Sequence, residues 1–488
     1  MADLHWMSAT ELARDLDAGD LSSVEVTEAL LARTDEVDPK ISAYLHRTAE
    51  RAANEARAAD ERRSRGESRS AFDGVPIAYK DIFVTKDVPT TAGSRILEGY
   101  VPPYDSTVVA RCGAGGLPML GKLNCDEFAM GSSTENSGFF VTRNPWDLER
   151  VPGGSSGGSA ATVAGGGAPW AWGTDTGGSV RQPASLCGIV GVKPTYGLVS
   201  RYGLIAFASS LDQAGPFARH VEDAAALLQM AAGHDKCDST SIPRPVPDYL
   251  SAIDTGVDGM RIGVVREFQE AEGTQPGVRT RVEEAYRRLE KLGANLEEVS
   301  LPSFEHGISA YYLVAPAEAS ANLARYDGVR YGLRSKAGDD IIAMTSRTRD
   351  EGFGDEVKRR IMLGTYALSA GYYEAYYGKA QKVRTLIIQD LERAYERVDL
   401  IVCPTSPTTA FKLGERVDDP LAMYLSDVFT VPVNMAGNAA ISVPCGLSPG
   451  DGLPVGLQII AKALDEETMF RAAFAFEQDL GFAERPPL

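Results

Sequence analysis

Two short clusters of serine and glycine, 24 residues apart, are the part of the sequence best suited to chemistry. The first is Gly153-Gly-Ser-Ser-Gly-Gly158 and the second is Thr176-Gly-Gly-Ser179. Glycines on both sides of a serine allow a sharp turn and a close approach by another group, because no Cβ stands in the way. A hydroxyl beside clustered backbone N–H groups supplies a nucleophile and donors for an oxyanion, which is what acyl transfer requires.

A flexible linker and a phosphate-binding loop are the other structures that such clusters can form. The residues between the clusters include Val163, Trp170 and Trp172, and such side chains are not typical of a solvated linker. Neither cluster ends in the Gly-Lys-Ser/Thr of a P-loop. The segment 116–123 comes near that pattern, but Leu123 stands where the hydroxyl that holds Mg²⁺ would be, and we interpret this segment as a strand and a turn. A flexible linker and a phosphate-binding loop therefore explain these clusters less well than a site for acyl transfer does.

A serine nucleophile needs a base, and histidine is the usual one. The five histidines all lie outside the motifs: His5, His46, His220, His234 and His306. The segment 74–80 reads as a short buried strand that ends in Lys80. A lysine at the end of a strand is usually an exposed charge, so Lys80 alone is weak evidence. It is nevertheless the available base.

The composition is typical of a globular protein that neither crosses a membrane nor grips a nucleic acid by itself. Of the 488 residues, 44% are hydrophobic and 24% are charged, which suffices for a large core. No apolar run approaches the ~18 residues of a spanning helix, and the first residues do not resemble a signal peptide. The net charge of −18 opposes contact with phosphates, so a partner would handle any nucleic acid. We expect a cytoplasmic protein without membrane association.

The cysteines do not indicate a metal site. They form no C-x-x-C pair and have no histidine at ligand spacing, so buried thiols in a reducing compartment are the expectation. The six are Cys112, Cys125, Cys187, Cys237, Cys403 and Cys445. We therefore expect neither a metal nor another cofactor in this chain.

The elements that must position these residues alternate between helix and strand. Capping boxes at 8–11 and 22–25 predict two N-terminal helices, and mixed charges over 47–69 predict a solvated helix face. Further strands are predicted at 188–194, 260–265, 296–301, 398–404 and 456–460, and helices at 221–232, 278–292 and 466–480. This alternation indicates an α/β fold. Without a linker-like break, residues 1–488 are expected to form a single large domain, with N-terminal helices over 8–69, a core over about 70–220 and a substrate-binding part over about 255–488.

Residues 303–378 are more helical and aromatic than the rest of the sequence. Their tyrosines are expected to serve mainly in packing rather than in function: Tyr311, Tyr312, Tyr372, Tyr373, Tyr376 and Tyr377.

The arrangement of Lys80, Ser155 and Ser179 resembles the amidase signature superfamily. In that family a lysine ends a strand, GGSSGGS follows about 75 residues later, and TD-x-GGS-[IV]-R-x-P follows after 24 more. This chain has each part at that spacing. The resemblance implies that Ser179 is the nucleophile, Ser155 a bridging serine and Lys80 the base, with the backbone N–H groups of Thr176, Gly177, Gly178 and Ser179 as the oxyanion hole. It also implies a mixed central sheet with helices on both faces.

This chemistry places an energetic demand on Lys80. With a reference pKa of ~10.4, removing its proton at pH 7 costs roughly 4.6 kcal/mol. Burial can lower the pKa of a lysine by ~3 to 5 units, which offsets most of that cost. We therefore expect Lys80 to be buried among hydroxyl groups and to be largely neutral during acylation.

A narrower resemblance covers nearly the whole chain and is to the A subunits of the bacterial and archaeal aspartyl/glutamyl-tRNA amidotransferases. It is carried by the segments 121–136, 200–212, 326–332, 356–361 with 369–373, and Asp427 ahead of 432–434. The later segments lie outside the general signature and separate these subunits from free-standing amidases. The resemblance implies a glutaminase that supplies ammonia within a heterotrimer. There the B subunit binds the tRNA and uses ATP and Mg²⁺ to amidate Glu-tRNA(Gln) or Asp-tRNA(Asn), and a small C subunit braces the pair.

The same resemblance implies roles for three further residues. Arg360 would fork onto the α-carboxylate of glutamine, Asp427 would pair with its α-ammonium group, and Tyr311 would help to line the pocket. Two other functions stay open at this point. One is a free-standing amidase that acts on another primary amide, and the other is a scaffold that keeps the fold without the chemistry.

Overall fold

A mixed β-sheet of eleven strands runs through the middle of the molecule. The computed structural model describes residues 3–269, 273–337 and 340–488. Within the sheet, β2 pairs in parallel with β3 and β4, and β7 pairs in parallel with β8 and β9. The other neighbours are antiparallel. In spatial order the strands are β1 (Tyr44–Arg47), β3 (Met119–Leu123), β2 (Ile77–Lys80), β4 (Trp170–Thr174), β6 (Ala214–Ala218), β5 (Val190–Lys193), β10 (Ala440–Leu447), β11 (Pro454–Ala461), β9 (Leu400–Pro404), β7 (Arg261–Val265) and β8 (Asn295–Val299).

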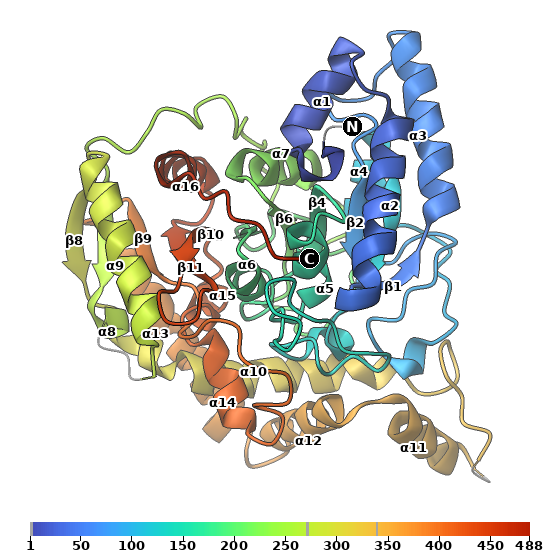
Figure 1. Ribbon diagram of the computed structural model, residues 1–488. Coiled ribbons are helices and arrows are strands. Elements are labelled where there is room, and N and C mark those ends of the chain that lie inside the picture. Colours follow the sequence, from blue (N-terminus) through green and yellow to red (C-terminus); the bar gives the residue numbers. More distant parts are fainter. Residues whose placement is uncertain (1–2, 270–272, 338–339) are drawn as a thin grey trace.

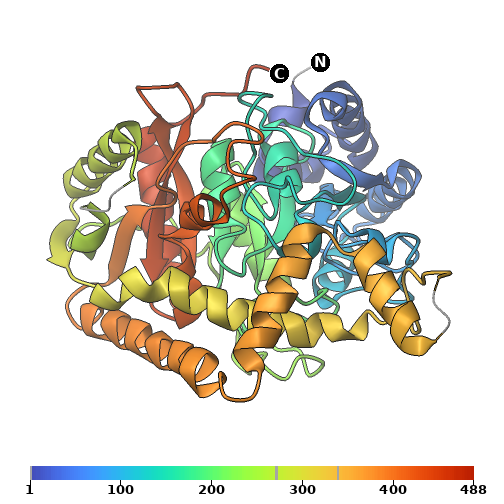
Figure 2. The same cartoon turned by 90° about the horizontal axis from the view of Figure 1, so that it is seen from below.

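Helices cover both faces of the sheet, as expected (Figure 1). Along β9, Leu400 and Val402 belong to one hydrophobic core, and Ile401 and Cys403 belong to a second one. Because successive side chains of a strand point to opposite faces, the two cores lie on opposite sides of the sheet. The first contains residues of α7 (Val221–Ala231), α9 (Pro276–Lys291) and α16 (Glu466–Leu480). The second contains residues of α10 (Gly307–Asn322) and α13 (Lys379–Ala394), which cross the sheet in Figure 2.

The remaining helices include the two that the capping boxes predicted. Ser8 donates its backbone N–H to Glu11 Oε2 at 2.8 Å, and the Glu11 N–H returns a bond to Ser8 Oγ at 3.0 Å. The same reciprocal pair links Ser22 and Glu25. These helices are α1 (Ala9–Ala18), α2 (Ser23–Ile41), α3 (Ala49–Ser64), α4 (Thr107–Ala114), α5 (Gly157–Ala164), α6 (Arg181–Cys187), α8 (Arg266–Gln269), α11 (Ile341–Gly352), α12 (Asp355–Leu368), α14 (Pro420–Tyr424) and α15 (Val431–Ala436). No helix of the described residues is both long and apolar enough to span a membrane.

Four strands were not predicted, namely β1, β4, β6 and β10. The most consequential of them is β4, which lies between the two serine-glycine clusters. All five of its residues are buried, as are those of β6. A strand that is covered on both faces shows no polar–apolar alternation, so its sequence lacks the usual signal.

Candidate active site

The serines and the lysine come from segments that meet at one end of neighbouring strands. Lys80 is the last residue of β2, and its parallel neighbour β4 ends at Thr174. Ser155 lies two residues before α5, and Ser179 lies in the turn between β4 and α6. The carboxyl ends of parallel strands share one edge of a sheet, which is the usual place for a binding site in α/β proteins.

The amine of Lys80 is fully buried and is surrounded by hydroxyl groups. Its Nζ donates to Ser155 Oγ at 2.8 Å, to Ser156 Oγ at 2.9 Å and to Thr174 Oγ1 at 2.8 Å. An ammonium group has three donors, so these three oxygens complete its hydrogen bonding. The structure thus brings Lys80 and Ser155 together and adds two partners that were not predicted from the sequence.

Burial lowers the pKa of Lys80 to about 8, against the opposing influence of nearby acidic groups that include Asp126 and Asp175. Among the described residues, no carboxylate is bonded to the amine. A pKa near 8 leaves about a tenth of the amines neutral at pH 7, compared with fewer than about one in a thousand for an ordinary lysine. The expected hydroxyl-rich, buried site is therefore present, but its lysine is only partly neutral at pH 7.

The two predicted catalytic serines differ in their exposure. Ser155 is fully buried, whereas Ser179 is 7% exposed, so Ser179 is the one that a substrate can reach. The two segments are tied together by the backbone N–H of Ser156, which donates to the carbonyl of Ser179 at 3.3 Å. The peptide bond between Gly154 and Ser155 is cis. Lys80 and Ser155 are thus both fully buried, and Ser179 is the only one of the three with an exposed fraction.

The turn 176–179 presents its backbone N–H groups without internal acceptors. Within the described parts of the chain, no group accepts a hydrogen bond from any of these four N–H groups. The turn is held instead through other atoms. Thr176 Oγ1 donates to Asp212 at 2.7 Å, and Thr430 Oγ1 donates to the carbonyl of Gly177 at 2.7 Å. Such a turn can donate to an oxyanion without first breaking bonds of its own.

Two glycines are required by the packing around this turn. A Cβ on Gly177 would lie 2.8 Å from the hydroxyl of Tyr311. Gly178 has a φ of +140°, and a Cβ there would lie 2.2 Å from Thr430 Oγ1. Any larger residue would displace the turn, so these glycines serve close packing as well as chain reversal.

A buried ion pair fixes the two ends of the turn. Arg181 donates to both carboxylate oxygens of Asp175 at 2.9 and 3.0 Å, and Asn434 Nδ2 adds a bond of 2.8 Å. Burial opposes the ionisation of Asp175, but the charge of Arg181 and these hydrogen bonds outweigh it and lower the pKa to about 2. Neither residue was assigned a role from the sequence, although both stand within the recognised motif. The presence of both residues in the motif TD-x-GGS-[IV]-R was the sequence signal that could have indicated this ion pair.

Arg360 is buried on α12, although a run of three basic residues would ordinarily be solvated. Its Nε donates to Glu356 Oε1 at 2.7 Å, one helical turn away. The guanidinium carbon lies 5.2 Å from the ring centre of Tyr312 and 5.5 Å from those of Tyr424 and Phe207. An arginine held by one carboxylate and three rings keeps donors for a further anion. The spacing of Glu356 and Arg360 on a helix could have revealed this pair, but it was not predicted.

Asp427 is buried beside the turn with one oxygen satisfied. Its Oδ2 accepts a bond from the hydroxyl of Ser132, whereas its Oδ1 has no partner among the described residues. A Cβ on Gly178 would lie 3.0 Å from that Oδ1, so the free oxygen faces the turn. Burial raises the pKa of Asp427 to about 7, and the charge of Arg360 partly opposes the rise. Asp427 and Tyr311 thus adjoin the turn, and the charge of Arg360 lowers the pKa of both groups against the effect of burial.

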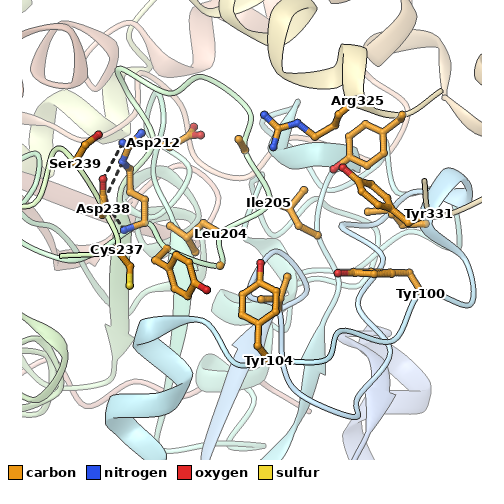
Figure 3. A pocket seen from close by; sticks show the side chains of 17 residues that line it. Tyr100, Tyr104, Leu204, Ile205, Asp212, Cys237, Asp238, Ser239, Arg325 and Tyr331 are labelled. Carbon is orange, nitrogen blue, oxygen red and sulfur yellow. Dashed lines mark hydrogen bonds and ion pairs between the residues drawn. The ribbon is translucent and has the colours of Figure 1, made fainter. Parts of the chain in front are cut away.

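A separate pocket of about 600 Å³ lies on the other side of Asp212 (Figure 3). Five tyrosines and two arginines, Arg201 and Arg325, are among the residues that line the pocket. Arg201 forms an ion pair with Asp238. Lys80 and the two serines are not among its lining residues. Asp212 lines this pocket and also accepts a hydrogen bond from Thr176 Oγ1, but no residue of the turn 176–179 is among the lining residues, so the pocket is distinct from the site of the serines.

The described residues contain no cluster of metal ligands. No group of three or more histidine, cysteine, aspartate or glutamate side chains is placed there to hold a metal ion.

A cluster of lysine, two serines and a donor-rich turn defines a class of amide-hydrolysing enzymes, and comparison with known proteins agrees. The family model described as Amidase matches residues 25–470, and the chain belongs to this family.

More particular similarities extend over the full length. The chain is 60% identical to the A subunit of glutamyl-tRNA(Gln) amidotransferase from Moorella thermoacetica, covering 99% of each chain. It is 59% identical to the protein of that name from Streptomyces coelicolor, covering 98% of this chain and 96% of the relative. The crystal structure of the corresponding glutamyl-tRNA(Gln) amidotransferase protein from Thermotoga maritima superposes with a TM-score of 0.82 at 44% identity, over 99% of this chain and 97% of that one. These names describe one component of a larger enzyme.

Proposed function

We propose that this chain is the glutaminase subunit of a tRNA-dependent amidotransferase. The observation that carries the proposal is the free Oδ1 of the buried Asp427 beside the turn, together with the buried guanidinium of Arg360. The free Oδ1 of Asp427 suits an α-ammonium group, and the guanidinium of Arg360 suits an α-carboxylate. A simple aliphatic or aromatic amide would leave the Oδ1 of Asp427 without a partner and would not use the remaining donors of Arg360. The full-length similarity to the A subunits of amidotransferases supports the same conclusion.

In the proposed acylation, Ser179 Oγ attacks the side-chain carbonyl of glutamine. Its proton passes to Ser155, whose own proton passes to the neutral amine of Lys80. The carbonyl oxygen becomes an oxyanion that accepts hydrogen bonds from the N–H groups of 176–179. When the tetrahedral intermediate collapses, the C–N bond breaks and the proton held by Lys80 returns through Ser155 to the leaving nitrogen. The products of this step are ammonia and a γ-glutamyl ester on Ser179.

Deacylation uses the same groups with water as the nucleophile. Water gives a proton to the relay as it attacks the ester carbonyl, and the proton is then returned to Ser179 Oγ. The ester bond breaks and glutamate leaves, so the balance is glutamine plus water to glutamate plus ammonia. Ser156 and Thr174 take no proton in this scheme. They hold the amine in line with Ser155.

The ammonia would be consumed by partner subunits. We propose a heterotrimer in which the B subunit contacts the tRNA and uses ATP and Mg²⁺ to amidate Glu-tRNA(Gln), Asp-tRNA(Asn) or both, and the C subunit braces the assembly. The net charge of −18 is consistent with leaving the tRNA to the B subunit. This chain would need no cofactor of its own, and we place the complex in the cytoplasm.

Glutamate release with and without the B and C subunits tests the proposal. We expect partner-dependent hydrolysis of glutamine that is abolished by Ser179→Ala. Ser155→Ala is expected to lower kcat by roughly 10³-fold or more, because the relay is broken. Ser156→Ala is the matched control, because its hydroxyl contacts Lys80 at nearly the same distance and is expected to cost much less.

Three results would contradict the proposal. Robust turnover of aliphatic or aromatic primary amides by the chain alone would favour a free-standing amidase. Failure of a serine-directed electrophile to label Ser179 would favour a scaffold without chemistry. Full glutamine hydrolysis by the Ser179→Ala variant would exclude the proposed nucleophile.

A further inference from the structure

A buried glutamine at the start of α6 is bonded to two segments of the proposed site but takes no part in the proposed relay. Gln182 is fully buried. Its Oε1 accepts a hydrogen bond from the backbone N–H of Gly154 at 3.0 Å, and its Nε2 donates to the carbonyl of Ser132 at 2.9 Å. Since an N–H group only donates and a carbonyl only accepts, a single orientation of the amide satisfies both bonds. Gln182 therefore links the segments of Gly154 and Ser132.

The first of these bonds reaches the relay. Gly154 directly precedes Ser155, the proposed bridging serine. The backbone N–H of Gln182 also donates to the carbonyl of Gly178 at 2.8 Å, and Gly178 directly precedes the nucleophile Ser179. Gln182 is thus bonded to the chain next to each of the two catalytic serines.

The second bond reaches the carboxyl group that is proposed to bind the α-ammonium group. The hydroxyl of Ser132 donates to Asp427 Oδ2, which leaves Oδ1 as the free oxygen that faces the turn. Burial raises the pKa of Asp427, and the hydrogen bond from Ser132 opposes this rise and so favours the charged form. Ser132 therefore supports both the orientation and the charge that Asp427 needs to pair with an ammonium group.

The segment 131–133 has few other restraints on its backbone. Among residues 3–269, 273–337 and 340–488, no group besides Gln182 forms a hydrogen bond with the backbone of these three residues. The segment is also packed closely on Gly154, because a Cβ there would lie 2.6 Å from the backbone nitrogen of Ser133. Removing the amide would leave this packing in place. A substitution of similar size is therefore expected to loosen Ser132 without unfolding the site.

Neither side chain is needed by the chemistry of the signature. In TD-x-GGS-[IV]-R-x-P, Gln182 occupies the second open position. Ser132 lies in the segment 121–136, which carries the narrower resemblance to the A subunits of amidotransferases. No proton passes through either residue in the proposed relay. Residues that hydrolysis itself does not use can instead serve the choice of substrate.

We propose that Gln182 is a positioning residue that determines the specificity for glutamine, acting through Ser132 on Asp427. This inference rests on the proposed function, because it assumes that Asp427 pairs with the α-ammonium group. The bond to Gly154 holds the segment of the bridging serine, and the bond to Ser132 keeps Asp427 Oδ1 directed at the substrate. One side chain thereby keeps the relay and the ammonium-binding carboxylate in register with the two ends of one glutamine molecule.

Glutaramate, which is glutamine without its α-amino group, is the probe for this role. Both compounds have the carboxamide and the carboxylate, but only glutamine can use Asp427. The assay compares the release of ammonia from the two compounds by the complex with its B and C subunits. For the wild type we expect kcat/KM to be roughly 10³-fold higher for glutamine, because a substrate that leaves a buried polar group unpaired is strongly rejected.

Gln182→Met keeps the approximate size of the side chain and removes both amide bonds. We expect the ratio of the two kcat/KM values to fall at least roughly tenfold, mainly through the KM for glutamine, because a hydrogen bond to a charged group is worth at least that factor. A disturbance of Gly154 would instead lower kcat for both substrates and leave the ratio unchanged.

Ser132→Ala separates the two bonds of Gln182. It removes only the hydroxyl on Asp427 and is expected to lower the ratio by a similar factor, with an unchanged kcat for glutaramate. The double variant Gln182→Met/Ser132→Ala is expected to have the same ratio as Ser132→Ala alone. A residue that acts through another has no separate effect once the other is removed.

Gln229→Met is the matched control. Gln229 also accepts a hydrogen bond from a backbone N–H at 3.0 Å, that of Tyr249, but it lies on α7, outside the proposed site. We expect this variant to have the ratio of the wild type. Labelling of Ser179 by a serine-directed electrophile and the Tm are measured for every variant. If Gln182→Met is not folded, the ratio of Ser132→Ala decides the inference.

Two results would overturn the inference. An equal loss of activity towards both substrates in Gln182→Met, with an unchanged ratio, would make Gln182 a merely structural residue. Losses in the ratio that multiply in the double variant would exclude the route through Ser132. Both results leave the proposed function intact, because the wild type still prefers glutamine. A wild type that hydrolyses glutamine and glutaramate equally well would instead count against the proposed function.

Discussion

Raising the pH from 6 to 9 is expected to activate glutamine hydrolysis through the amine of Lys80. Burial lowers the pKa of this amine to about 8, and only its neutral form can accept the proton that Ser155 passes on. The neutral fraction is about 1% at pH 6, about 9% at pH 7 and about 90% at pH 9. We therefore expect kcat to rise about tenfold per pH unit and to level off above pH 8. An unperturbed lysine would instead give a rise that continues towards pH 10.

The assay is steady-state glutamate release by the complex with its partner subunits between pH 5.5 and 9.5 at constant ionic strength. Two variants separate Lys80 from other titrating groups. Lys80→Arg keeps the positive charge but cannot lose its proton, so activity is expected to fall by roughly 10³-fold. Thr174→Val removes an acceptor that lies 2.8 Å from Nζ and favours the charged form. The pKa is therefore expected to fall further, and the rise in activity to move to lower pH.

A profile that is flat between pH 6 and 9 would refute the reasoning, because the amine could not then be the titrating base. Substantial activity in Lys80→Arg would do so equally. An unshifted profile for Thr174→Val, with unchanged stability, would show that the group titrating near pH 8 is not the one that the hydroxyls surround.

Three further outcomes follow from the contacts around the turn. Arg360→Lys is expected to raise the KM for glutamine by roughly 30- to 100-fold with little change in kcat, because a lysine lacks the planar fork; a KM within about threefold of wild type in steady-state assays would contradict the assigned role. Since burial raises the pKa of Asp427 to about 7, this carboxyl group becomes protonated as the pH falls below 7 and can no longer pair with an ammonium group. The KM is therefore expected to rise below pH 7, and Asp427→Asn is expected to have a high KM without this pH dependence. Asp175→Asn leaves the buried Arg181 without its counter-ion and is expected to lower the free energy of unfolding by about 3 to 5 kcal/mol; urea unfolding measures this, and a loss below about 1 kcal/mol would show that the asparagine still satisfies the arginine.

Local patterns allowed the elements with strong short-range signals to be predicted. The capping boxes at Ser8 and Ser22 depend on residues only three apart, and both formed as expected. The α/β class followed from alternating periodicities. By contrast, β4 and β6 are buried throughout, so no periodicity marks them. Their identity as strands comes from pairing with β2 and β5, and β2 lies far from β4 in the sequence.

The missing strand explains why part of the site was not anticipated. Tyr79 in β2 is paired with Trp172 in β4, so the ends of these parallel strands, Lys80 and Thr174, adjoin. A strand recognised at 170–174 would have brought Thr174 to the same edge of the sheet as Lys80, whereas the 2.8 Å bond between Thr174 Oγ1 and Nζ could be found only in the structure. The pairing of Ser132 with Asp427 is of a different kind, because 295 residues separate them and only the assembled fold brings them together. Resemblance to a family supplied Asp427 as a candidate, but the free oxygen that suits it to an ammonium group could be found only in the structure.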